Sequence, residues 1–171
     1  QYIGGGTNNT SSNSANSFIG AGCNNQLSCA ELGFIGSGNN NLITGSSYAH
    51  SIVGGENNTI IESTSGSSIV GGTNNTINSN TGCNFIAGGN SNTISSSFQS
   101  SILGGDTNII NSPCSVILGG FNNSIEGTQN NFIGVGSNQI ITSSRWSTIV
   151  NGTTNEIYNN FRTHVRKKYP E

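Results

Sequence analysis

Apolar and polar positions repeat every 15 to 17 residues along this chain. Each repeat begins with an isoleucine, has glycine three residues later, usually asparagine six residues later, and usually an aliphatic residue eight residues later. A spacer rich in Ser, Thr and Asn completes the repeat. A period of this length is typical of solenoids, in which each repeat forms one structural unit. The ten first isoleucines are Ile3, Ile19, Ile35, Ile52, Ile69, Ile86, Ile102, Ile117, Ile133 and Ile149.

Each repeat is too long for a single strand, because 16 extended residues would span about 53 Å. The chain must turn within the repeat, and β-branched residues on both sides of the turn favour strands. We therefore expect an all-β fold, a parallel β-solenoid (β-roll) of about ten coils stacked about 4.8 Å apart, with both isoleucines of a coil inside. Glycine reaches positive φ easily, so the expected turn residues are Gly6, Gly22, Gly38, Gly55, Gly72, Gly89, Gly105, Gly120, Gly136 and Gly152.

The asparagine column suits such a stack, because a side-chain amide can donate to one coil and accept from the next. We interpret it as a structural ladder inside the rod. One repeat has Gln139 at this position. The other nine have Asn9, Asn25, Asn41, Asn58, Asn75, Asn92, Asn108, Asn123 and Asn155.

Residues on either side of the first isoleucine vary together. An aromatic residue before it is followed by Gly or Ala after it, as with Phe18 and Gly20, whereas a smaller residue is followed by Val or Leu, as with Ser51 and Val53. Positions i and i+2 share one face of a strand, so the pair fills a fixed volume, as packed interiors require. We expect this face to pack in a homotrimer, and the alternative is a covering loop of the same chain. The predicted interface comprises Phe18, Phe34, Val53, Val70, Phe85, Leu103, Leu118, Phe132 and Val150.

Composition narrows the functional classes. Charged residues make up 7% of the chain, and residues 1–144 contain no Lys or Arg, so nucleic-acid binding is not expected. No apolar stretch approaches 18 residues, so we expect no membrane insertion. The absence of methionine indicates a piece of a longer chain. We place the repeat domain at residues 1–157 and a basic C-terminal tail or docking segment at residues 158–171.

Catalytic chemistry is not expected. Glu56 and Asp106 share a column three coils apart, about 14 Å, whereas a glycosidase pair lies roughly 5 to 9.5 Å apart. His50 and His164 are isolated, so we predict no catalytic residue, no metal and no cofactor.

The four cysteines leave two possibilities open. Cys83 and Cys114 fall two coils apart in one column, too far for a disulfide. Cys23 and Cys29 could meet across the second coil, or could remain as buried free thiols.

The spacers contain irregular large side chains that could contact a ligand: Tyr48, His50, Phe98, Arg145 and Trp146. Packing of these residues at subunit seams or on neighbouring coils is the alternative. A threonine column at Thr59, Thr76 and Thr93 suggests an ice-binding face as a further alternative, but the column breaks at Ile109.

Units such as SIVGGENNTI at 51–60 and SIVGGTNNTI at 68–77 resemble the head repeats of trimeric autotransporter adhesins and the repeats of bacteriophage and large-virus tail fibres. The resemblance covers residues 2–157. It implies a homotrimeric, extracellular rod on a cell surface or virion that presents a binding surface. We therefore expect a non-enzymatic structural or adhesive fibre module, with a cell-surface glycan or protein receptor as its partner. The alternatives are a filament subunit that assembles end to end and a glycan-degrading tailspike.

Overall fold

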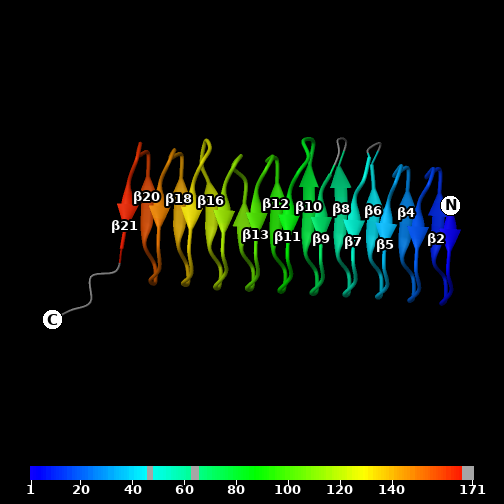
Figure 1. Cartoon of the computed structure of the whole chain (residues 1–171). Helices are drawn as coiled ribbons and strands as arrows, with labels where there is room; N and C mark the ends of the chain where they lie inside the picture. The colour runs from blue at the N-terminus through cyan, green and yellow to red at the C-terminus, as the bar shows by residue number, and fades with distance from the viewer. Residues whose placement is uncertain (46–47, 63–65, 167–171) are drawn as a thin grey trace.

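The computed structural model describes residues 1–45, 48–62 and 66–166 and contains two parallel β-sheets and, among these residues, no helix. The chain winds as a β-solenoid, with successive coils side by side along a rod and the two termini at its opposite ends (Figure 1). The predicted all-β solenoid is confirmed. Residues 46–47, 63–65 and 167–171 lie outside the described part. The last range includes Lys167 and Lys168 of the predicted basic tail.

Each coil contributes one short strand to each sheet. The eleven-stranded first sheet consists of β1 (Tyr2–Ile3), β3 (Phe18–Ile19), β5 (Phe34–Ile35), β7 (Ser51–Ile52), β9 (Ser68–Ile69), β11 (Phe85–Ile86), β13 (Ser101–Ile102), β15 (Val116–Ile117), β17 (Phe132–Ile133), β19 (Thr148–Ile149) and β21 (His164–Val165). The ten-stranded second sheet consists of β2 (Thr10–Ser12), β4 (Gln26–Ser28), β6 (Leu42–Thr44), β8 (Thr59–Glu62), β10 (Thr76–Ser79), β12 (Thr93–Ser95), β14 (Ile109–Ile110), β16 (Ser124–Glu126), β18 (Ile140–Thr142) and β20 (Glu156–Tyr158).

The core is a double column of aliphatic side chains between the two sheets. In one coil, Ile52 from the first sheet and Ile60 from the second are both fully buried. The same pair recurs in every coil from Ile19 and Leu27 to Ile149 and Ile157. Because strands alternate their side chains between two faces, one inward residue per strand leaves its neighbours on the outer faces of the rod.

The first sheet continues past residue 157, where we placed the end of the repeats. Strand β21 pairs in register with β19, with Thr148 opposite His164 and Ile149 opposite Val165. The Val150 amide also donates to the Val165 carbonyl at 3.0 Å. Valine, which is β-branched, takes the place of the isoleucine. Residues 158–165 therefore belong to the solenoid, and the predicted boundary falls inside the ladder.

The predicted turn glycines form one corner of every coil. All ten have positive φ, between 88° and 143°. At Gly55 a Cβ atom would overlap the carbonyl oxygen of Gly72 and lie 2.5 Å from Nδ2 of Asn58. Glycine is required here both for the backbone conformation and for the close stacking of neighbouring coils.

The asparagine column forms a buried hydrogen-bonded ladder. Nδ2 of Asn75 donates to Oδ1 of Asn58 at 3.1 Å and to the carbonyls of Gly71 and Gly89 at 3.1 and 3.0 Å. Its own Oδ1 accepts from the backbone and side-chain N–H groups of Asn92 at 3.1 and 3.2 Å. Each amide therefore links three coils and saturates backbone carbonyls that the glycine corner leaves inside the rod.

The ladder is weaker at Gln139. Its Nε2 donates only to the Ser137 carbonyl, at a long 3.4 Å. The glycines at this point, Gly136 and Gly152, have φ of 143° and 132°, away from the values near 90° to 109° of the other coils. The extra methylene of glutamine moves the amide out of reach of the two carbonyls that an asparagine would bind.

Restoring asparagine should stabilise the rod. We expect Gln139→Asn to regain up to two hydrogen bonds and raise the free energy of unfolding by about 1 kcal/mol, which corresponds to about 2 to 4 °C in thermal midpoint for a chain of this size. The matched control is Asn75→Gln, which should lower the midpoint. An unchanged midpoint for Gln139→Asn in circular dichroism melts would contradict the assigned role of the side-chain length.

A second buried polar column lies two residues before eight of the ten first isoleucines; the exceptions are Ile3, where this place is the exposed Gln1, and Ile35, where it is Gly33. Its side chains accept a backbone N–H from the next coil: Nδ1 of His50 from Ser67 at 3.2 Å, and Oδ1 of Asn84 from Ser100 at 3.2 Å. Serines fill most of the other places, including Ser67, Ser100, Ser115 and Ser147. The rod therefore has two internal ladders, one at each side of the isoleucine columns.

Candidate interaction face

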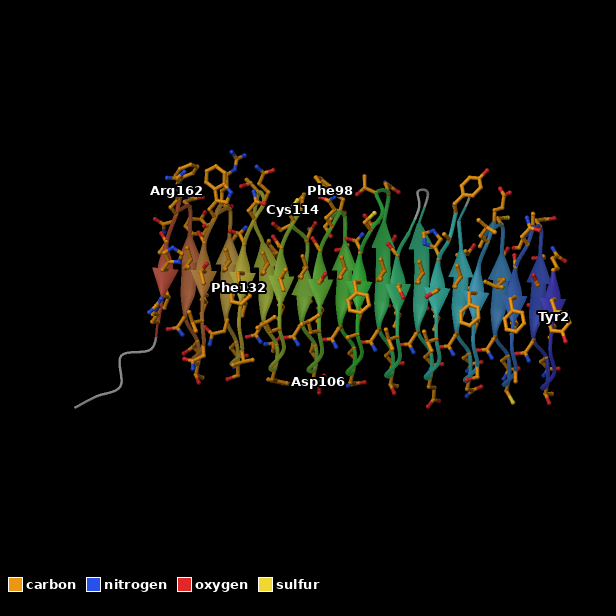
Figure 2. All side chains as sticks on the ribbon, in the orientation of Figure 1. Tyr2, Phe98, Asp106, Cys114, Phe132 and Arg162 are labelled. Carbon is orange, nitrogen blue, oxygen red and sulfur yellow. The ribbon has the colours of Figure 1, made fainter. Side chains whose placement is uncertain are left out.

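The outer face of the first sheet bears an uncharged stripe along most of the rod. The outward residues flank the isoleucine of each strand, and from Tyr2 to Val150 none of them is charged. Their exposure is high for apolar side chains, for example 37% for Phe18 and 48% for Val53. We define the apolar stripe as Tyr2, Phe18, Phe34, Val53, Val70, Phe85, Leu103, Leu118, Phe132 and Val150; Figure 2 labels Tyr2 and Phe132 on this face.

The rings of Phe18 and Phe34 lie beside the glycine two residues further on. A Cβ at Gly20 would lie 3.2 Å from Cε1 of Phe18, and one at Gly36 would lie 3.3 Å from Cε1 of Phe34. The Phe18 and Phe34 rings also stack on each other, with centroids 5.6 Å apart and planes 7° apart. A Cβ at Gly20 or Gly36 would also overlap the carbonyl oxygen of Gly36 or Val53 in the next coil. Glycine at these two positions is therefore required by the neighbouring coil as well as by the ring.

No part of the described chain covers this stripe. Phe18, Phe34, Val53, Val70, Leu103, Leu118 and Val150 are all exposed in the single chain, and Phe85 and Phe132 are partly so. The alternative of a covering loop from the same chain is therefore wrong for the described residues. All nine residues predicted to form an oligomer interface lie on this one face.

The second sheet has a different outer surface. Thr59, Thr76 and Thr93 pair in register across β8, β10 and β12. The column continues with Ile109, Ser124 and Ile140 and ends at Glu156, and the exposed Glu126 lies on the same outer face. This face lacks the continuous uncharged character of the apolar stripe.

Four of the five predicted ligand-contact residues lie at one corner of the coils. Tyr48, Phe98 and Arg145 are four residues before the first isoleucine of their coils, and Trp146 is three before. Figure 2 shows Phe98, Cys114 and Arg162 along this edge of the rod and Asp106 along the opposite edge. We name the edge that bears Tyr48, Phe98, Arg145 and Trp146 the spacer edge. The Glu31 carboxylate raises the pKa of the Tyr48 phenol above its usual range, by accepting a hydrogen bond and by its charge.

His50 is not a surface ligand contact. It is 1% exposed and belongs to the second internal ladder, where its Nδ1 accepts the Ser67 amide. The prediction was wrong because the chain turns a corner between Tyr48 and His50, so that the side chain two residues after the exposed tyrosine points into the coil. Its neighbour at the corner, Ala49, has a φ of 62°.

Two arginines and two aromatic residues form a compact group at the C-terminal end of the spacer edge. The guanidinium carbons of Arg145 and Arg162 lie 5.7 and 5.1 Å from the Trp146 ring centroid. Arg162 is also 5.5 Å from the ring centroid of Phe161, which meets Trp146 edge to face at 4.9 Å. Phe161 and Arg162 were not among the predicted contacts, although they repeat Arg145 and Trp146 one coil later.

Other candidate chemistry is dispersed. Glu56 and Asp106 lie in one column with Thr73 and Asn90 between them. All four cysteines are free; Cys23, Cys29 and Cys83 are exposed and Cys114 is partly so, which excludes both the bridge and the buried thiols considered for Cys23 and Cys29. Within the described ranges, no three His, Cys, Asp or Glu side chains are placed to share a metal ion.

No protein-family model matches the sequence, and no curated protein sequence matches it significantly. In the described part of the chain, no helix has the length and apolar character needed to cross a bilayer. The features that bear on function are therefore the rod itself, its apolar stripe and its spacer edge.

Proposed function

We propose that this chain is a non-enzymatic structural module of a fibre on a cell surface or virion, a rod that associates with copies of itself as a homotrimer and presents its spacer edges for adhesion. The observation that carries the proposal is the apolar stripe. Exposed apolar patches of more than a few hundred square ångströms mark interaction surfaces on soluble proteins. The extracellular location follows the resemblance of the repeats to adhesin heads and tail fibres.

A second copy of the chain is the partner that best fits the stripe. The stripe extends over many coils, and its side chains recur with every coil step of about 4.8 Å. A partner that buries it along its length must carry apolar groups at the same spacing, and another copy does so by construction. Chains related by rotation about a common axis present identical stripes to that axis, which supports the homotrimer.

The arrangement of carboxylates supports a non-enzymatic role. The carboxylates of Glu56 and Asp106 lie in one column with two coils between them. They are therefore three coil steps, about 14 Å, apart. A glycosidase pair needs roughly 5 to 9.5 Å. The stiffness expected of a shaft comes instead from the two internal ladders, which tie each coil to both of its neighbours.

The test is the mass in solution by light scattering, which should be three times the chain mass of 17.6 kDa. We expect the double substitution Val70→Lys and Leu103→Lys to reduce this to the chain mass, because buried unpaired ammonium groups at an interface are strongly unfavourable. The β-rich circular dichroism spectrum should persist. The matched control, Thr76→Lys with Ile109→Lys, adds the same charges to the outer face of the second sheet in the same two coils.

The control should remain a trimer. A monomeric wild-type chain at micromolar concentration would overturn self-association, and a dimer would overturn the three-fold arrangement. Equal dissociation by both double variants would show that charge alone, rather than its place on the apolar stripe, separates the chains.

A further inference from the structure

The corner that forms the spacer edge fixes side chains in columns. Arg145 and Phe161 are bridge partners on adjacent coils, so these two residues lie one above the other. Trp146 and Arg162 follow them with φ of 53° and 61°, a left-handed conformation held by amide hydrogen bonds to Gln129 and Arg145 of the preceding coils. The backbone therefore sets the positions of all four residues, which we call the Arg–aromatic cluster.

Contact with the Trp146 ring positions both guanidinium groups. Arginine stacks its planar group on aromatic rings and keeps the edge N–H donors available for bidentate contacts. The guanidinium carbons of Arg145 and Arg162 lie over Trp146, 5.7 and 5.1 Å from the ring centroid. Less side-chain entropy is lost when a ligand binds to groups that are already held in place.

Neither guanidinium has an acidic or hydrogen-bonding partner in the part of the chain that the structure describes. Each guanidinium group has five N–H donors and no hydrogen-bond acceptor, and its planar shape favours planar anions such as carboxylate. Residues 1–144 contain no Lys or Arg. The Arg–aromatic cluster is therefore a local positive site at the end of a rod whose first 144 residues carry no cationic Lys or Arg.

We propose that the Arg–aromatic cluster binds an acidic saccharide, with the two guanidinium groups on the carboxylate or sulfate of a sugar and the exposed ring of Phe161 against its C–H face. Phe161 is 61% exposed, so its ring is open to a ligand. The inference deepens the adhesive part of the proposed function and rests on it, but it does not require the apolar stripe.

A saccharide fits better than a nucleic acid. Nucleic-acid binding gains its strength from many phosphate contacts with Lys and Arg along a groove. The rod on the N-terminal side of Arg145 has no cation to continue such a track, and its charged side chains there, such as Glu126, are acidic. Two guanidinium groups match one or two anionic substituents on an uncharged ring.

The experiment is calorimetric titration of the full chain with a galacturonate hexamer, its fully methyl-esterified form, a sulfated galactose hexamer and a single-stranded oligothymidylate. We expect binding of the carboxylated or the sulfated sugar, and weaker binding by tenfold or more of the neutral ester, since charge-assisted hydrogen bonds are lost. The first and third probes distinguish a carboxylate from a sulfate ligand.

Arg145→Gln and Arg162→Gln should each weaken binding about tenfold. Arg166→Gln is the matched control, because it removes the same charge from the first-sheet column that contains Val150, outside the cluster. Light scattering on each variant reports assembly separately, so that loss of binding with an intact trimer is distinguished from loss of the fibre itself.

Three results with the sugars would overturn the proposal: no binding of either acidic sugar, equal binding of the acid and its methyl ester, or equal loss of affinity in Arg166→Gln and the cluster variants. Binding of oligothymidylate as tight as that of the sugars would assign the cluster to polyanions in general and would also overturn it.

Discussion

Gly72→Ala should lower the free energy of unfolding by about 3 kcal/mol, and the thermal midpoint by about 6 to 12 °C. Two costs add. Gly72 has a φ of +88°, where an L side chain is disfavoured by about 1 to 2 kcal/mol. A Cβ there would also overlap the Gly89 carbonyl and lie 2.6 Å from Nδ2 of Asn75. Both neighbours belong to the fixed stack of coils, so neither can move without disturbing the ladder.

The adjacent glycine provides the control. A Cβ on Gly71 would meet nothing within 4 Å, so Gly71→Ala should change the free energy of unfolding by no more than about 0.5 kcal/mol. Both variants lose one glycine at the same turn, and they differ only in backbone conformation and the space around Cβ. Thermal melts in which the two midpoints fall together would contradict the requirement for glycine at position 72.

Features that recur with one residue type at a fixed offset could be predicted from the sequence. The isoleucine columns, the glycine corner and the asparagine ladder each keep the same chemistry in almost every repeat, because each place in a stacked coil has nearly the same surroundings. Where the residue type departs, as at Gln139, the hydrogen bonding departs with it. A period and its exceptions therefore contain most of the information about this fold.

The second internal ladder escaped prediction because three residue types serve it equally. Ser67, Asn84 and His50 all offer an acceptor to a backbone N–H of the next coil. Their common property is an acceptor atom close to the backbone on a short side chain, which a search for one repeated residue type misses. Variable spacer lengths also hide the column when repeats are aligned from their first isoleucines forward. Counting backward from each isoleucine would have found it, and with it the burial of His50.

The Arg–aromatic cluster shows the same limitation at the surface. Arg145 and Phe161 are 16 residues apart in sequence, and only the stacking of coils brings them into contact as bridge partners. The apolar stripe was easier to predict, because its paired volumes, such as Phe18 with Gly20, lie within one strand. Local coupling could therefore be read from the chain, whereas contacts between spacers needed the register of the coils.

Asn75→Asp should be more damaging than any substitution considered above. Asn75 is fully buried, and its Nδ2 donates to three oxygens: Oδ1 of Asn58 and the carbonyls of Gly71 and Gly89. A carboxylate would place a negative charge against these acceptors, without a cation nearby. An unpaired buried charge costs about 3 to 5 kcal/mol. We expect a loss of about 4 kcal/mol at pH 7, measured by urea unfolding against the wild-type chain.

The pH dependence of Asn75→Asp separates the charge from the lost hydrogen bonds. Burial and the facing carbonyl oxygens raise the pKa of the introduced carboxyl above its unfolded value of about 3.9. The native state then binds more protons than the unfolded state between the two pKa values, so stability relative to wild type rises as the pH falls through the folded pKa and levels off near pH 3.9. Asn75→Leu carries no charge and should show a smaller loss that does not vary with pH. Parallel pH profiles for the two variants would show that the loss of stability comes from the missing amide donors alone, and that the carboxylate charge does not add to it.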